Sequence, residues 1–305
     1  MKTAPKNLAA SVRDRLKALA VQRRENFDLL LVRYGIERLL YRISASSQKH
    51  QFVLKGAMLF TAWEGFQHRE TRDLDLMGFG ESSIESLVKV FQSVCAADVQ
   101  ADGLEFVSVK GETIRALEEY GGVRLTVIAK LTAARITIQV DVGFGNCITP
   151  APKEISFPTL LDFPAPKLRA YPVETVIAEK LQALVDLGLR NGRLKDYYDL
   201  WHLGHKVNFD GQLLARAIRA TFTQRKTRFP ESDPVGLTAR YHDDVLRQSA
   251  WIAFGKKLNK KNQPVALPDV VAFLSEFLLP PLNAAASEEI WKESWTAGGP
   301  WKAHR

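Results

Sequence analysis

Within the sequence RDLDLM, residues 72–77, charged and apolar side chains alternate from Asp73 to Leu76. This two-residue period is typical of a β-strand with one face in a core and the other face in polar surroundings. Asp73 and Asp75 therefore leave the same face of the predicted strand, while the leucines between them point into the core. Two carboxylates this close repel each other unless a cation lies between them. Oxygen ligands with an open side suit Mg²⁺ or Mn²⁺ bridging to phosphates.

A second alternating strand, RITIQVDV at residues 135–142, carries Asp141 on its polar face. If the two strands are neighbours, three carboxylates converge, and such a set holds two metals for in-line attack on the α-phosphate of a nucleotide. The alternative is structural, because Asp-x-Asp alone is a weak motif and strand ends often carry aspartate for turns.

Candidate phosphate-binding residues lie upstream of the acid pair. Lys55-Gly56 stands at an apparent turn into a helix, where glycine permits close backbone approach and N–H groups at a helix start favour phosphate. Arg69 and Thr71 directly precede the acids and are expected either to contact phosphate or to order the loop. The alternative for Lys55-Gly56 is an ordinary turn.

A predicted helix at residues 172–187, PVETVIAEKLQALVDL, has a lysine where a hydrophobic residue is expected. Lys180 lies at the centre of the apolar stripe, which indicates a cleft containing an anion; the alternative is that the ammonium group reaches water past its apolar stem. The next helix, within residues 192–203, carries Asp196 on its apolar face. We expect Lys180 to pair with Asp196, and Asp199 to pair with Lys195 one turn away.

The order of patterns predicts an α+β protein. Residues 7–43 are helical in pattern, a mixed core with strands and helices spans about 50–150, prolines mark a long connection, and everything after Pro172 is expected to be helical. The corresponding domains are 1–49, a helical segment; 50–170, the core; and 171–305, a helical region that contributes to the active site.

Composition indicates a globular protein with basic flanks. The chain has 305 residues, 46% hydrophobic and 25% charged, and its two cysteines form no disulfide framework or zinc motif. No apolar run of transmembrane length and no signal core is evident, so we expect a cytoplasmic protein without a membrane partner. The net charge is +8, and the Lys/Arg excess gathers in residues 1–24 and 211–262, which favours a polyanionic partner such as RNA, DNA or nucleotide.

Three motifs in order, spanning about residues 52–203, resemble the AbiEii/AbiGii-type nucleotidyltransferase toxins, including MenT-like enzymes, of the DNA polymerase β-like superfamily. They are LKGAMLF (54–60) with RETRDLDL (69–76), IQVDVGFG (138–145), and ETVIAEKLQAL (174–184) with RLKDYYDL (193–200). The resemblance implies a small mixed β-sheet with flanking helices, followed by a helical C-terminal region. One departure is Ala57, where the family often has a second glycine and more distant relatives a serine.

The resemblance also implies a function and roles for residues. Asp73 and Asp75 match metal ligands, Asp141 matches the third carboxylate, and Lys180 and Asp196 match later active-site motifs. Such proteins are toxins of toxin–antitoxin or phage-defence systems, which implies an antitoxin partner, and MenT-like members add nucleotides to tRNA 3′ ends. We therefore expect Mg²⁺- or Mn²⁺-dependent transfer from a nucleoside triphosphate to tRNA or another RNA.

Two alternatives remain open at this point. One is nucleotidylation of a protein hydroxyl by the same chemistry. The other is a non-catalytic nucleic-acid-binding regulator built on the same fold.

Overall fold

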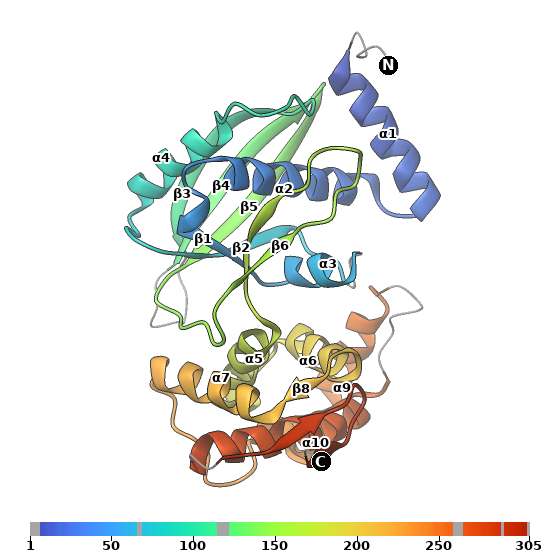
Figure 1. Ribbon diagram of the computed structural model, residues 1–305. Helices are drawn as coiled ribbons and strands as arrows, with labels where there is room; N and C mark the ends of the chain where they lie inside the picture. The colour runs from blue at the N-terminus through green and yellow to red at the C-terminus, as the bar shows by residue number, and fades with distance from the viewer. Residues whose placement is uncertain (1–6, 66–68, 115–121, 259–264, 288–289, 304–305) are drawn as a thin grey trace. The chain divides into compact units, whose positions relative to one another are not determined.

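The structure, a computed structural model, describes residues 7–65, 69–114, 122–258, 265–287 and 290–303 (Figure 1). Its Cα atoms group into two compact units. The first, here called the sheet unit, comprises Met1–Gly145 and Lys153–Ala170; the second, the helical unit, comprises Asn146–Pro152 and Tyr171–Arg305. The domain boundaries predicted from the sequence stay a prediction.

The sheet unit is built on a seven-stranded mixed sheet in the order β3-β4-β5-β2-β1-β7-β6. β2 runs parallel to β5 and β1 parallel to β7, and the other neighbours are antiparallel. This confirms the α+β class and the mixed sheet. The strands are β1 Phe52–Lys55, β2 Asp73–Gly78, β3 Glu105–Ile114, β4 Gly122–Leu131, β5 Ala134–Gly143, β6 Lys153–Ser156 and β7 Lys167–Ala170.

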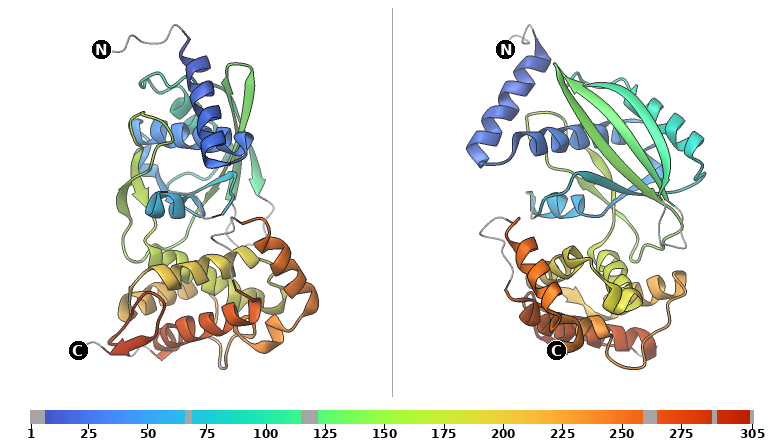
Figure 2. Two further views of the ribbon diagram at one scale, coloured as in Figure 1. Left: turned by 90° about the vertical axis from the view of Figure 1, so that its right-hand side faces the viewer. Right: turned by 180° about the vertical axis from the view of Figure 1, so that it is seen from behind.

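Two helices, α2 (Phe27–Ala45) and α4 (Ile84–Cys95), cover the apolar face of this sheet (Figure 2). Gly35 lets α2 approach closely, since a Cβ there would lie 2.9 Å from the side chain of Ile138 on β5. Gly111 on β3 meets Ile84 of α4 in the same way. The polar residues of β2 and β5 therefore lie on the opposite face, because successive side chains of a strand alternate.

Two further helices complete the sheet unit. α1 (Leu8–Arg23) packs against α2, and α3 (Met58–Glu64) directly follows β1. The N-terminal helical pattern predicted from the sequence thus forms two helices. α1 ends at Arg23 and α2 begins at Phe27, and between them Arg24 adopts a left-handed backbone conformation with a φ of 56°. A 3₁₀ helix, Lys49–Gln51, leads into β1.

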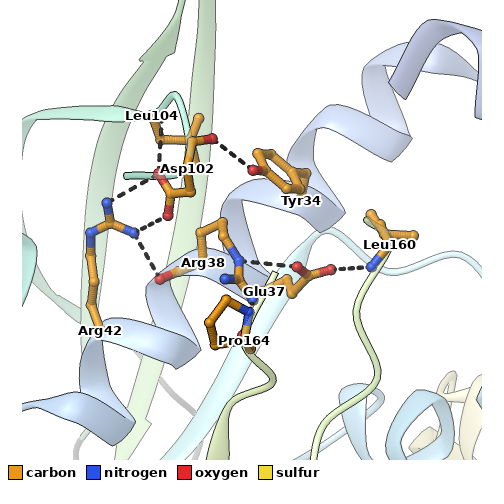
Figure 3. A network of polar contacts seen from close by, with 8 residues as sticks. All are labelled: Tyr34, Glu37, Arg38, Arg42, Asp102, Leu104, Leu160 and Pro164. Atoms are coloured by element: carbon orange, nitrogen blue, oxygen red, sulfur yellow. Dashed lines mark hydrogen bonds and ion pairs between the residues drawn. The ribbon is translucent and has the colours of Figure 1, made fainter. Parts of the chain in front are cut away.

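Charged side chains on α2 are buried and tie the helix to two connections of the chain (Figure 3). Arg42 donates to both carboxylate oxygens of Asp102, at 2.6 and 3.2 Å, and the Tyr34 hydroxyl donates to the Asp102 carbonyl at 2.7 Å. Because every polar atom buried here costs free energy unless it is paired, these bonds anchor the connection before β3 on α2.

The other half of this network holds the connection between β6 and β7. Glu37 lies 3.0 Å from the Arg38 guanidinium and accepts a 2.6 Å hydrogen bond from the Leu160 N–H. Arg38 donates to the Pro164 carbonyl at 2.9 Å. The proline-rich connection predicted from the sequence is therefore divided: Pro150 and Pro152 fall in the helical unit, and residues 153–170 belong to the sheet unit. This second part contains β6 and β7, two short strands that the sequence did not predict.

The helical unit contains six α-helices and a small sheet among its described residues. Aromatic packing joins the two, since Trp295 and Trp301 pack on Phe277. The elements are α5 Val173–Leu187, α6 Leu194–Lys206, α7 Gly211–Gln224, α8 Ala239–His242, α9 Val245–Gly255, α10 Leu267–Ser287, β8 Phe209–Asp210, β9 Glu293–Trp295, β10 Trp301–Ala303 and 3₁₀ helices Gly188–Arg190 and Val235–Leu237. The expectation that everything after Pro172 is helical was wrong, because strands of two or three residues leave no alternating pattern to detect.

The helix α10 corrects a second expectation. It is 21 residues long and apolar enough, by length and composition, to cross a membrane, although the sequence analysis expected no such run. Nine of its side chains are buried, and it packs against α6 and α7. A buried core helix has the same composition as a membrane span when most of its surface is covered by neighbours.

Candidate active site

A row of charged residues crosses four adjacent strands on the polar face of the sheet. Lys55 on β1 is the register partner of Asp75 on β2, Asp75 is the partner of Asp141 on β5, and Asp141 is the partner of Arg124 on β4. Register partners on neighbouring strands project to the same face. β2 and β5 are thus neighbours, which is the condition that the sequence analysis set for Asp141 to lie beside the acid pair. Asp73 lies two positions before Asp75 on this face, opposite Gln139.

The absence of a side chain at Gly56 leaves the space that the carboxylate of Asp75 occupies. The φ of Gly56 is +71°, and a Cβ added there would lie 2.0 Å from Oδ2 of Asp75. A side chain at this position is therefore excluded both by the backbone conformation and by the carboxylate. Ala57, which follows, adopts an ordinary helical conformation at φ −68° and provides no side-chain cap for α3.

Lys55 extends over the neighbouring strands. Its Nζ would lie 3.3 Å from a Cβ built on Gly143, although β2 lies between the strands of these two residues. The bare glycine of the IQVDVGFG motif thus leaves room for the ammonium group. Gly143 could not be identified from the sequence, because the need for a missing side chain appears only when the neighbouring strand is known.

Arg124 is the second residue that the sequence analysis missed. Its Nε donates to Oδ1 of Asp141 and its Nη2 donates to Oδ2, both at 2.8 Å. The hydrogen bonds to Asp141 raise the pKa of the Arg124 guanidinium above its usual value. The alternation of β4 puts Arg124 on a polar face, but the register that sets it beside Asp141 cannot be read from the strand alone.

The loop before β2 is ordered locally. The hydroxyl oxygen of Thr71 accepts a long, 3.4 Å hydrogen bond from the Asp73 N–H, which supports the loop-ordering alternative for Thr71. Arg69 is partly exposed, and its predicted phosphate contact stays a prediction.

The donor set of this face fits a divalent cation through two carboxylates. Asp73 and Asp75 are partly exposed and share one face, and Mg²⁺ typically takes one or two carboxylates while water and phosphate fill its other positions. Asp141 is engaged at both oxygens by Arg124. No group of three or more His, Cys, Asp or Glu residues arranged to hold a metal ion exists in the part of the chain that the structure describes.

A second charged cluster lies within the helical unit. Nζ of Lys180 lies 2.5 Å from Oδ1 of Asp196 and 2.9 Å from Oδ2 of Asp199. The predicted Lys180–Asp196 pair is confirmed. The expected pairing of Asp199 with Lys195 was wrong: Asp199 is completely buried and faces Lys180, whereas Lys195 is exposed. The lysine at the centre of the apolar stripe is thus matched by two carboxylates of α6.

Comparison with known proteins identifies a family. The model of a family described as "Nucleotidyl transferase AbiEii toxin, Type IV TA system" matches residues 38–297. No curated protein matches the chain.

Two solved structures from Helicobacter pylori are similar to the chain. The protein JHP933 is 14% identical, with 82% of this chain and 89% of that one covered, at a TM-score of 0.44. A protein described as a candidate nucleotidyltransferase is 14% identical, with 82% and 92% covered, at a TM-score of 0.43. At this distance the similarity assigns a role to no residue.

Proposed function

The chain belongs to the AbiEii nucleotidyltransferase toxin family, and from this premise we propose that it transfers a nucleoside monophosphate from a nucleoside triphosphate to the 3′ hydroxyl of an RNA, with tRNA as the preferred acceptor. The observation that supports this reaction is the charged row on the sheet, in which Asp75 and Asp141 are register partners with Lys55 on one side. Carboxylates flanked by cations on one open face suit the phosphates of a metal-bound nucleotide.

Each candidate site residue of the sheet unit has a role in this proposal. Asp73 and Asp75 hold Mg²⁺ or Mn²⁺, which when bound supplies charge stabilisation for the phosphates. The ammonium group of Lys55 neutralises phosphate oxygens, and Arg69 adds a further positive charge. Gly56 and Thr71 shape the turn and the loop against which Asp75 and Asp73 rest.

The reaction itself is a displacement at the α-phosphate. The bond between the acceptor oxygen and the α-phosphorus forms, the bond between the α-phosphorus and the bridging oxygen breaks, and pyrophosphate leaves. Asp141 accepts the proton of the attacking hydroxyl. Two of its lone-pair positions are used by Arg124, and a carboxylate has about four, so acceptor capacity remains.

In the helical unit we propose Lys180 and Asp196 as further catalytic residues. Asp196 and Asp199 hold the ammonium group of Lys180 in place through the two ion pairs of this unit. This role rests on the match of both positions to the family motifs and on the confirmed ion pair.

The biological setting follows from the family. The chain is a toxin with a cognate antitoxin, and we propose that it acts in the cytoplasm, where its nucleotide and RNA substrates occur, with phage defence as its role. Incubation with ³²P-labelled nucleoside triphosphates and either total RNA or lysate protein tests the reaction. We expect label on tRNA with wild type, none with Asp73→Asn or Asp75→Asn, and normal labelling with Asp98→Asn, an exposed control in the same unit.

Other outcomes separate the competing functions. Label on protein alone would replace the RNA acceptor by a protein hydroxyl. An Asp73→Ala chain that remains folded and fully toxic to growing cells would point to a non-catalytic regulator.

A further inference from the structure

Arg124 lies on the catalytic face but has no part in the reaction proposed above. It stands on β4, two strands from Asp75, at a Cα separation of about 10 Å, since neighbouring strands lie about 4.8 Å apart. Its side chain is 35% exposed, which leaves it accessible from the polar face of the sheet. It lies on the far side of the carboxylates from Lys55.

The contact with Asp141 leaves much of the guanidinium group available. Arginine has five N–H donors in a rigid fork, and Asp141 takes one from Nε and one from Nη2. Among the described residues, only Asp141 accepts a hydrogen bond from Arg124. The remaining three donors are held in a fixed orientation, because a two-point contact prevents the planar group from turning.

Stability alone explains this pair poorly. Water screens an ion pair whose side chains are 35% and 20% exposed. Even the two-point geometry, which makes such a pair stronger than most, leaves three donors of the arginine without a role in folding. A planar, oriented cation with unused donors is instead the arrangement that recognises phosphate. The carboxylates beside it would hold the metal and the acceptor proton, so the anion that Arg124 meets there is a phosphate of the substrate.

We infer that Arg124 is a further substrate-binding residue, which hydrogen-bonds a phosphate of the bound nucleoside triphosphate and which Asp141 keeps oriented. This inference rests on the proposed function, since it assigns the phosphate to the nucleotide of that same site. Asp141 then has two roles, as the orienting partner of Arg124 and as the acceptor of the hydroxyl proton.

Nucleotide binding without turnover tests the inference. Equilibrium dialysis with Mg²⁺ and α,β-methylene analogues of the four nucleoside triphosphates measures affinity, because these analogues cannot transfer a nucleotide. We expect Arg124→Gln to bind the analogues about tenfold more weakly or worse, because one charge-assisted contact is lost. The affinity of Arg124→Lys should lie between those of wild type and Arg124→Gln. Lys130→Gln removes the same charge from an exposed position of the same strand and should bind like wild type.

A second pair of variants separates phosphate binding from mere neutralisation of Asp141. If Arg124 served only to neutralise that carboxylate, Asp141→Asn would restore the affinity of Arg124→Gln. We expect no restoration in the double variant, and restoration would overturn the inference. Arg124→Lys answers the same question if the glutamine variant fails to fold, because it keeps the charge and loses the planar fork.

The result is distinguishable from a failure of the proposed function. Unchanged analogue binding by Arg124→Gln, in a preparation whose wild type labels RNA, overturns the inference alone. Weakened binding of fluorescent tRNA with unchanged analogue binding also overturns it, since the phosphate would then belong to the acceptor. Binding that depends on Arg124 in a chain that transfers nothing supports the inference and rejects the reaction.

Discussion

Gly56 shows how a residue without a side chain shapes the candidate site. Its φ is +71°, and a Cβ there would lie 2.0 Å from Oδ2 of Asp75, so no space is left for a methyl group. We expect Gly56→Ala to cost about 1–3 kcal/mol of stability through backbone strain and to reduce transfer by about 100-fold or more, because Asp75 is displaced. Thermal unfolding and RNA labelling measure the two effects.

Gly80 supplies the matched control for that prediction. Its φ is also positive, +95°, but a Cβ there meets no atom within 4 Å. Gly80→Ala should therefore lose stability through strain while keeping transfer. If both variants keep transfer, Gly56 is an ordinary turn residue and Asp75 tolerates displacement.

Lys180 lies at the centre of the apolar stripe of α5. Asp199 is completely buried and Asp196 is nearly so, and both face the same ammonium group. We expect Lys180→Met to destabilise the chain by about 3 kcal/mol or more, since two buried carboxylates lose their cation. Chemical denaturation compares it with Lys195→Met, an exposed lysine on α6.

The opposite result would change the interpretation of that lysine. A Lys180→Met chain that gains stability and still labels RNA would make Lys180 a tolerated misfit. Stability lost together with unchanged transfer would leave the cluster a purely structural one, and the proposed catalytic role of Lys180 would be rejected.

At the scale of the element, helix α2 carries a buried carboxyl group whose titration should be visible in stability. Burial raises the pKa of Glu37 to about 7, above the value of 4.5 expected for an exposed glutamate. The unfolded chain therefore releases this proton at lower pH than the folded chain does. The contribution of Glu37 to stability is greatest below pH 4.5 and declines as the pH rises to about 7.

The change Glu37→Gln removes that titration. We expect the free energy of unfolding of wild type to include a decline of about 3 kcal/mol between those pH values, which the variant lacks. Urea denaturation across this pH range gives the comparison. As a control, Glu105→Gln changes an exposed residue of the sheet unit and should leave the pH profile of the unfolding free energy unchanged. If Glu37→Gln also leaves that profile unchanged, the prediction is contradicted.

How much of these elements could be predicted depends on the range of the interactions that form them. The alternation around Asp73 and Asp141 is local, so their strands and shared polar faces were predictable. The register that places Arg124 beside Asp141 is set by contacts between distant parts of the chain, so this pair was not. The four-residue strands β6 and β7 are too short for a period to emerge.

At the scale of the whole molecule, the basic charge is less available than the sequence suggests. Within residues 211–262, Arg219 donates to the Ala285 carbonyl, and Arg225 and Arg247 also bind internal acceptors. These arginines stabilise the helical unit and leave fewer cations for a polyanion. Exposed ones remain after α7, at Lys226 and Arg228.

The binding of an RNA acceptor should depend on these exposed cations and on salt. Each phosphate neutralised by a protein cation releases counterions, so the logarithm of affinity falls linearly with the logarithm of salt concentration. We expect the double change Lys226→Gln with Arg228→Gln to weaken tRNA binding and to reduce this slope by about 1 per lost contact. Fluorescence anisotropy with labelled tRNA in EDTA measures binding without transfer.

A control with equal charge decides whether this effect is local. Lys89→Gln with Lys153→Gln removes two exposed positive charges from the sheet unit and lowers the net charge equally. If the region after α7 holds the acceptor, only the first pair reduces the slope, and analogue binding stays unchanged in both. Equal reductions would mean that the chain attracts RNA through its net charge alone, because a general field does not distinguish where the charges lie.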